Sequence, residues 1–383
     1  MNIKLVKDTI DFDDISKLID WLKTNPRLTK GDLTLEFEKK WSKWLGVKYS
    51  VFVNSGSSAN LAAIYSLILS KKMKNNKIIV PAVSWVTTVT PAIQLGLTPI
   101  MCDCDKDNLG LDINHLKQII KDESPSAIIL VHVLGYPNHM NEIIELCKEN
   151  DIILIEDTCE SIGSEYNNKK LGTFGDLSTF SFYFGHHMST IEGGMVSTDD
   201  EDLYHILLSI RSHGWDRDLP TKKQEELREK YKINNFRALY TFYYPGFNLR
   251  ATDLQAFIGL NQMDKLDMIV KNRNKNYLKY KKEIKNDFWS ISEPEGSYVS
   301  NFSYPIITKN IDNLINELSK NNIECRPLIC GSINEHPFWY ERYGKQELNN
   351  SKIVHEYGLY IPNNHQMTED EINKVIKIVN ENI

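Results

Sequence analysis

The residues best suited to chemistry lie in the segment DLSTFSFYFGHHMSTIEGG, which spans 176–194. Two adjacent histidines, His186 and His187, follow a run at 178–183 that is typical of a β-strand. Imidazoles donate and accept protons near neutral pH, and a glycine pair such as Gly193 and Gly194 lets the main chain approach a ligand closely. Taken alone the segment is ambiguous, because two histidines in a solvated turn are the commoner arrangement.

A second segment, YSVFVNSGSSANL at 49–61, predicts an anion site. An apolar strand at 51–53 runs into a small polar turn at 54–58 and then into a helix. Free N–H groups and the helix dipole favour a phosphate at such a helix start, so Gly56 and Ser57 are candidate ligands. The segment is neither the G-x-G-x-x-G dinucleotide pattern nor a loop followed by G-K-[ST].

The elements that must position these residues alternate along the chain. Apolar strands are predicted at 77–81, 97–103, 126–135 and 151–160, with helices from Thr87, near 113–120 and at 140–149. Such alternation indicates an α/β fold with a mostly parallel sheet, covered on both faces, and places functional side chains at strand ends.

Several chemically useful residues stand at these predicted strand ends. They are Trp85, His132, Asp157 and Glu160. Each has an ordinary alternative, such as packing for Trp85 or helix capping for Asp157. The aromatic ring of Trp85 and the carboxylate of Asp157, together with the phosphate turn and the histidine segment, predict a single site.

The chain is predicted to form two domains. Residues 1–252 would form the large domain, and 253–383 would supply a long linking helix from Asp253 and a small α+β domain. Between them, the segment 212–248 is rich in aromatic residues and fits a pocket rim or an interface.

Composition narrows the functional classes. At 383 residues with a net charge of -6, the chain has no basic footprint for nucleic acid. Neither a signal-peptide pattern nor an apolar run of about 18 residues occurs, so we expect a cytoplasmic protein that does not span a membrane. The six cysteines lack metal-site spacing, so we expect no metal and no disulfide framework.

Six segments in combination resemble the sugar aminotransferase family (DegT/DnrJ/EryC1/StrS) of type I pyridoxal 5′-phosphate (PLP) enzymes. They are NSGSSANL (54–61), PAVSWVTT (81–88), IEDTCESIGSEY (155–166), LGTFGDLSTFSFYFGHHMSTIEGG (171–194), RSHGWDR (211–217) and YPGFNLRATDLQAFIG (244–259). The resemblance spans nearly the whole chain. It implies an aspartate aminotransferase-like fold with a large, mostly parallel seven-stranded sheet domain, a small C-terminal domain and a homodimer with shared active sites.

The resemblance also implies residue roles. Gly56, Ser57 and Ser181 would hold the cofactor phosphate, Trp85 would stack on the pyridine ring, and Asp157 would pair with the ring nitrogen. Glu160 would lie near the cofactor and substrate. Asn248 would reach the cofactor phosphate of the neighbouring subunit. The residues matched to the substrate are His187, which could instead orient His186, and His213, Arg217 and Arg326.

One position departs from the aminotransferases. Six residues before Glu192, where they carry the lysine that binds PLP covalently, this chain has His186, and imidazole cannot form that bond. The chain is therefore more similar to the PLP-dependent sugar 3-dehydratases of the family, in which we expect His186 to act as catalytic base and acid. A related dehydratase uses an iron-sulfur cluster, for which the cysteine-free stretch 160–324 leaves no evident place.

The dehydratase resemblance implies PLP and its pyridoxamine form as cofactor and L-glutamate as amino donor. The expected reaction removes the 3-hydroxyl of a nucleotide-activated 4-keto-6-deoxy sugar for surface polysaccharide biosynthesis. GDP is the favoured nucleotide, with CDP and the sugar's length and stereochemistry left open. Two alternatives are a nucleotide-sugar aminotransferase and a non-catalytic PLP-binding regulatory protein.

Overall fold

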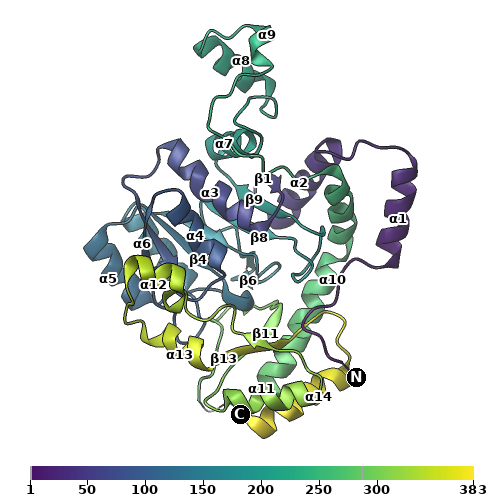
Figure 1. The fold of residues 1–383 in the computed structure, drawn as a ribbon, viewed down its shortest axis with the longest axis vertical. Coiled ribbons are helices and arrows are strands. Elements are labelled where there is room, and N and C mark those ends of the chain that lie inside the picture. Colours follow the sequence, from purple (N-terminus) through teal and green to yellow (C-terminus); the bar gives the residue numbers. More distant parts are fainter. Residues whose placement is uncertain (1, 287) are drawn as a thin grey trace.

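A seven-stranded sheet forms the centre of the large domain. The computed structural model describes residues 2–286 and 288–383 (Figure 1). In sheet order the strands are β1 (Tyr49–Val53), β9 (Gly194–Thr198), β8 (Leu177–Ser181), β5 (Ile153–Asp157), β4 (Ala127–Val131), β2 (Lys77–Pro81) and β3 (Thr98–Cys102). Only β9 runs antiparallel to both of its neighbours. The predicted mostly parallel seven-stranded sheet is confirmed.

Helices cover both faces of this sheet, as the two-sided apolar strands require. In β2, Ile78 and Val80 pack in one core and Ile79 packs in the other. The first face carries α3 (Gly56–Ser70), α4 (Val86–Gln94) and α7 (Glu201–Arg211). The second carries α5 (Ile113–Glu123), α6 (Met140–Glu149), α2 (Asp32–Leu45) and part of α10 (Asp253–Glu283).

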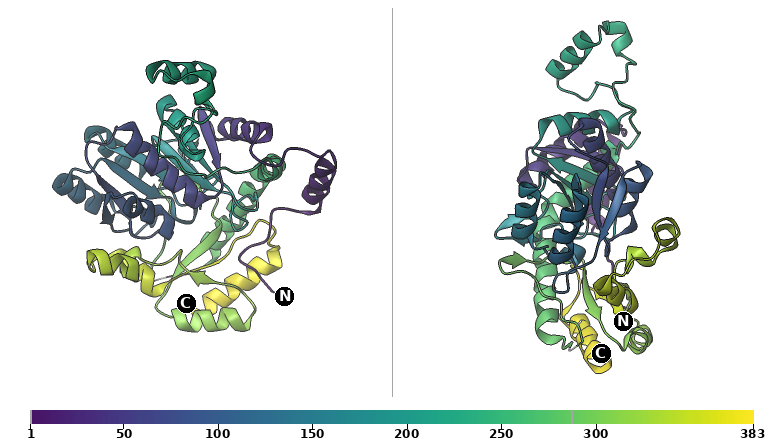
Figure 2. Two further views of the ribbon diagram at one scale, coloured as in Figure 1. Left: turned by 45° about the horizontal axis from the view of Figure 1, so that its top comes forward. Right: turned by 90° about the vertical axis from the view of Figure 1, so that its left-hand side faces the viewer.

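Two segments stand away from the body of the molecule. The segment 215–242, here called the arm, carries α8 (Thr221–Lys230) and α9 (Asn235–Ala238) and projects from the large domain at the top of Figure 1. The second view in Figure 2 shows the same projection. Helix α1 (Phe12–Lys23) lies at the side, joined to the body through contacts with α10.

The small domain is built on a three-stranded antiparallel sheet. Its strands are β11 (Ser303–Ile307), β13 (Gly358–Pro362) and β12 (Arg326–Pro327), in that order across the sheet. Its helices are α11 (Ile311–Lys320), α12 (Pro337–Tyr343), α13 (Asn349–Tyr357) and α14 (Glu369–Asn382). A further small sheet joins β6 (Glu165–Tyr166) to β7 (Lys169–Lys170) and to β10 (Ser297–Tyr298), and so links the two domains.

The first residues of the chain pack on the small domain, unlike the predicted division at 252. Ile3 forms a β-bridge with Ile323 and is buried in the small-domain core. The main-chain N–H of Leu5 donates to Glu324 Oε2 at 3.1 Å. Burial of the Ile3 and Leu5 side chains favours the packing of the N-terminal segment on the small domain. No helix in the described ranges is long and apolar enough to cross a membrane.

Candidate active site

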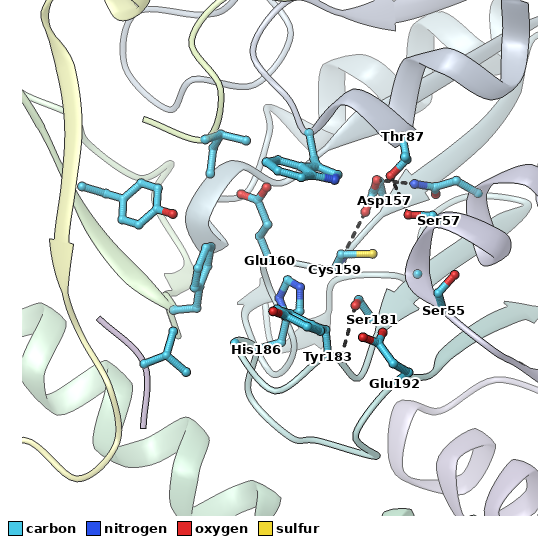
Figure 3. Close-up of a pocket in the computed structure, with 18 residues that line it drawn as sticks. Ser55, Ser57, Thr87, Asp157, Cys159, Glu160, Ser181, Tyr183, His186 and Glu192 are labelled. Atoms are coloured by element: carbon cyan, nitrogen blue, oxygen red, sulfur yellow. Dashed lines mark hydrogen bonds between the residues drawn. The ribbon is translucent and has the colours of Figure 1, made fainter. Parts of the chain in front are cut away.

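A cavity of about 400 Å³ lies where the carboxyl ends of β5 and β8 meet the small domain (Figure 3). Seven of the residues predicted from the sequence line it: Gly56, Ser57, Trp85, Asp157, Glu160, Ser181 and His186. The fold thus brings together residues that are up to 130 positions apart, from 56 to 186. Phe302, Ile329 and Tyr360 complete the wall from the small domain.

The start of α3 forms one end of the cavity. Gly56 is its first residue, and a Cβ placed there would lie only 2.6 Å from the Cβ of Ser181. The Ser57 hydroxyl donates to Thr87 Oγ1 at 3.0 Å. Glycine therefore allows the helix N-terminus to approach the Ser181 hydroxyl, and main-chain N–H groups and hydroxyls gather as they do around a phosphate.

Asp157, at the end of β5, is buried and held by three donors. Its Oδ2 accepts from Asn60 Nδ2 at 2.8 Å and from Thr88 Oγ1 at 2.7 Å, and its Oδ1 accepts from the Cys159 N–H at 3.1 Å. These bonds fix the carboxyl group at the cavity wall. A carboxylate has capacity for a further donor beyond these three.

Trp85 offers an aromatic surface to the same cavity. It immediately precedes α4, and 54% of its surface remains exposed although it lines the cavity. A large apolar ring left uncovered next to polar groups suits stacking against a flat ligand.

Glu160 differs from Asp157 in its surroundings. It is buried, and its one hydrogen bond among the described residues is from the Leu134 N–H to Oε2 at 2.8 Å. Burial, with a smaller contribution from the charge of Asp157, raises the pKa of Glu160 to about 8. The carboxyl group therefore carries a proton at neutral pH and can donate it in a hydrogen bond.

His186 lies in the turn between β8 and β9, half-buried in the cavity wall. Its ring centre is 5.6 Å from that of Phe302 and 6.4 Å from that of Tyr183. Burial, helped by the nearby positive charge of Arg273, lowers the pKa of His186 to about 4. The imidazole is therefore neutral at physiological pH, and its Nδ1 has no hydrogen-bond partner among the described residues.

His187 lies behind the turn and does not line the cavity. It is fully buried, with Nε2 at 2.9 Å from the Ser300 carbonyl oxygen and 3.0 Å from its hydroxyl oxygen. This placement corrects the expected substrate contact, because the buried ring points at Ser300 and holds the turn against the small domain.

Three other predicted residues gather outside this cavity, near the base of the arm. Arg250 joins two of them, because its Nε donates to Asn248 Oδ1 at 3.0 Å and its Nη2 lies 3.4 Å from His213 Nε2. Arg217 stacks over the Trp215 ring at 4.1 Å. Asn248, His213 and Arg217 are thus close to the same small region but not to the cavity of their own chain.

Arg326 lies elsewhere in the small domain. It is exposed on β12 and lines a separate hollow of about 230 Å³ together with Cys325 and His355. Arg326 therefore does not line the cavity, although it pairs across the sheet with Tyr360, which does.

Sequence reasoning missed part of the cavity lining. The missed residues are Val6, Ser55, Asn60, Thr87, Cys159, Tyr183, Gly185, Glu192, Phe302, Ile329 and Tyr360. Asn60 could have been found, because it is a polar residue directly before the largely apolar helix sequence LAAIYSLIL. No lysine lines the cavity among the described residues.

Comparison with known proteins gives consistent matches. Residues 9–380 match the DegT/DnrJ/EryC1/StrS aminotransferase family. The GDP-4-keto-6-deoxy-D-mannose 3-dehydratase of Escherichia coli O55:H7 is 36% identical over 383 residues, covering 97% of each chain.

Two solved structures have a similar fold along the whole chain. One is a GDP-4-keto-6-deoxymannose-3-dehydratase with a trapped PLP-glutamate geminal diamine, with a TM-score of 0.90, 34% identity and coverage of 99% of this chain and 100% of that one. The other is a histidine-to-asparagine variant of such an enzyme with bound GDP-perosamine, with the same TM-score of 0.90, identity of 34% and coverage of 99% and 100%.

Proposed function

Because the chain belongs to the DegT/DnrJ/EryC1/StrS aminotransferase family, we propose that it is a PLP- and L-glutamate-dependent nucleotide-sugar 3-dehydratase. Its proposed substrate is a GDP-linked 4-keto-6-deoxy sugar, as the names of its relatives indicate for those enzymes. The product is a GDP-linked 3,6-dideoxy-4-keto sugar, a precursor for surface polysaccharide.

One observation carries this proposal. His186 occupies the position at which the aminotransferases of the family carry their cofactor-binding lysine, and no lysine lines the cavity in the described part of the chain. A covalent bond between the cofactor and this site is therefore not available. An uncharged imidazole instead offers a base at the place where the lysine amine would stand.

The residues around the cavity fit PLP. Asp157 would pair with the ring nitrogen, the start of α3 with Ser181 would hold the phosphate, and Trp85 would cover one face of the ring. In its amine form the bound cofactor supplies the amino group that takes the place of the C4 oxygen and the electrons that expel the 3-hydroxyl.

His186 performs the proton transfers in this proposal. The neutral imidazole accepts a proton from the C4′ carbon of the cofactor. Because its pKa is lowered to about 4, the resulting imidazolium gives up its proton more readily than an ordinary histidine and returns it to the hydroxyl that leaves C3. The aromatic rings of Tyr183 and Phe302 lie beside the imidazole.

Glu160 is the second proton-carrying group. It stays protonated at neutral pH because burial raises its pKa to about 8. In this form it donates a hydrogen bond to an acceptor oxygen of the bound ligand without adding a second negative charge beside Asp157.

The proposal gives a balanced overall reaction. L-Glutamate becomes 2-oxoglutarate as it restores the amine form of the cofactor, and the sugar loses its 3-hydroxyl as water. Hydrolysis of the released nitrogen-bearing product consumes one water and yields the 4-keto group and ammonia. The amino group thus leaves as ammonia, whereas an aminotransferase would leave it on the sugar.

We also propose that the active enzyme is a homodimer with shared sites. Asn248, His213 and Arg217 lie near the base of the arm, outside the cavity of their own chain. The arm exposes Phe236 and Tyr240 at 77% and 74%. An exposed aromatic surface next to unused polar groups is typical of an interface.

We place the enzyme in the cytoplasm. All six cysteines are free, and three of them are buried, which is the usual pattern of a reducing compartment.

A turnover experiment tests the function. The protein is incubated with PLP, L-glutamate and GDP-4-keto-6-deoxymannose, and the nucleotide-sugar product is measured by mass spectrometry together with free ammonia. We expect a product one oxygen atom lighter than the substrate and one ammonia per product. A stable 4-amino sugar would support an aminotransferase instead, and cofactor binding without turnover of GDP- or CDP-linked substrates would support a regulatory protein.

A further inference from the structure

Arg273 is a buried cation with an unusual set of partners. It lies in the middle of α10 with 1% of its surface exposed, and no carboxylate lies within 4.0 Å of its guanidinium among the described residues. Burial lowers the pKa of Arg273 to about 9, which still leaves it charged at physiological pH. An unpaired buried charge costs considerable free energy, so its retention at this place calls for an explanation.

The guanidinium binds main-chain carbonyl oxygens of three separate segments. Nη1 donates to the oxygens of Phe302 at 2.7 Å and Asn363 at 2.8 Å, and Nη2 donates to the oxygen of His186 at 3.2 Å. Asn363 returns a hydrogen bond from its Nδ2 to the Arg273 carbonyl oxygen at 3.1 Å. The turn that carries the candidate base is therefore tied directly to both ends of the small-domain segment 302–363.

From these contacts we infer that Arg273 is a positioning residue for His186, which it holds in place through the main-chain oxygen of that residue while anchoring the histidine turn to the small domain. The inference rests on the proposed role of His186 as the base. Phe302 lines the cavity and is bonded to the same guanidinium, so a single side chain aligns the base with the cavity wall that faces it.

The charge of Arg273 has a second effect on the base. A cation near an imidazole disfavours the imidazolium, so Arg273 acts in the same direction as burial and keeps His186 neutral. The same cation acts on His187 and His365, whose pKa values are also lowered mainly by burial.

Other titratable groups also surround the His186 ring or share its cavity. They are Tyr183 and His187 on its own turn, Asp157 at the end of β5, Cys159 and Glu160 after it, Glu192 before β9, Tyr360 on β13 and His365 beyond it. Of the neighbours that act on the pKa of His186 by charge, Arg273 is the one that lowers it.

A second buried arginine supplies a matched control. Arg211 is also fully buried, but its guanidinium is paired with Glu38 and Asp218 and lies in another part of the large domain. Arg211→Gln removes a buried arginine without touching the histidine turn. It therefore reports what general destabilisation alone does.

The test measures His186 directly in the cofactor-free protein. Imidazole signals from histidine-labelled samples are followed by NMR against pH, with His186→Asn used for assignment, in the wild type and in the Arg273→Gln, Arg273→Lys and Arg211→Gln variants. We expect Arg273→Gln to raise the pKa of His186 by about one unit, a tenfold larger protonated fraction at acidic pH. Arg273→Lys should leave the pKa low, and Arg211→Gln should not move it.

Amide exchange of residues 183–190 tests the anchoring. It should become faster in both Arg273 variants, because lysine cannot reproduce the planar fork that binds several carbonyls. Both variants should lower kcat by about 10- to 100-fold through misplacement of the base. If Arg273→Gln does not fold, the Arg273→Lys variant alone decides the test. An amide exchange rate in that variant equal to that of the wild type would overturn the inference.

The outcomes separate this inference from the proposed function. Wild-type titration and wild-type exchange in the Arg273 variants would overturn the positioning role even if the enzyme deoxygenates its substrate. Absence of deoxygenation by the wild type would count against the function, while the titration and exchange would still decide the role of Arg273.

Discussion

The part of the cavity wall formed by Asp157, Ser57 and Thr87, here called the cavity floor, differs from the arm in how its side chains are satisfied. On the floor, Asp157 accepts three hydrogen bonds, and Ser57 and Thr87 are bonded to each other, so polar groups are fixed before a ligand arrives. On the arm, Phe236 and Tyr240 are mostly exposed, and the nearby polar groups bond mainly among themselves.

The two regions differ in how far contacts within one chain satisfy their side chains. The floor is preorganised by contacts within the large domain, which lowers the cost of arranging it when a ligand binds. The arm instead presents large apolar surface that is favourable only once it is covered. A single chain therefore combines a preorganised polar cavity with an exposed apolar arm.

Replacing His186 tests whether the preorganised cavity contains the catalytic base. We expect His186→Asn to lower deoxygenation by about 10³-fold or more, because the amide fills similar space but cannot transfer protons. Cofactor binding, measured by absorbance after dialysis, should remain largely intact. Borohydride should leave the wild type without a covalent adduct, whereas His186→Lys should gain one. An adduct on a lysine of the wild type would contradict the assignment.

Replacing Asp157 tests the preorganised floor itself. Asp157→Asn keeps the size of the side chain but removes the negative charge that stabilises a protonated ring nitrogen, so we expect turnover to fall by about 100-fold. Turnover with excess PLP distinguishes this electronic effect from weak binding. Full recovery in excess cofactor would mean that Asp157 serves binding alone.

Mixed dimers test whether the arm completes the site of a second chain. Asn248→Asp and His186→Asn should each be inactive, but a hybrid retains one site with both residues intact. Random exchange makes half of the dimers hybrid, so activity should recover to about a quarter of the wild type. If hybrids form, as shown by two affinity labels on one particle, and no activity returns, Asn248 does not act across the interface.

The smallest expected effect is the change in the stability of the folded protein with pH that Glu160 causes. The pKa of Glu160 is raised from 4.5 to about 8 in the folded protein, so its contribution to stability is fully present below pH 4.5 and is lost progressively as the pH rises to 8. Without cofactor, the wild type should therefore lose about 2 °C or more of thermal midpoint between about pH 5 and pH 8 relative to Glu160→Gln. Parallel profiles for the two proteins would contradict a raised pKa.

Sequence reasoning predicted the regular part of the fold well. The strand predicted at 77–81 and the helix at 140–149 have the same bounds in the structure, because their apolar patterns and turn residues agree with the tertiary environment. It did not predict β9 or β13. Both strands are five residues long and pair with strands distant in sequence, so their formation depends on tertiary contacts that a local pattern does not show.

A residue's place in the cavity was predictable where both its chemical type and the flanking sequence pointed to it. Asp157, a carboxylate at the end of an apolar strand, is an example. Arg273 could not be recognised, because it lies in the basic run VKNRNKNYLKYKK, where its charge is indistinguishable from those of exposed neighbours. His187 was misplaced for the converse reason. Adjacent residues in a turn point in different directions, and only the three-dimensional structure shows that one faces the cavity and the other Ser300.

The N-terminal bridge between Ile3 and Ile323 has a consequence for how the protein is made. Val6, three residues beyond that bridge, is part of the cavity wall. During synthesis, this wall cannot assemble until the ribosome has produced the small domain, more than 300 residues after Ile3. A nascent chain that has already folded its sheet would still lack this part of the site, so ligand capture should be delayed until synthesis is nearly finished.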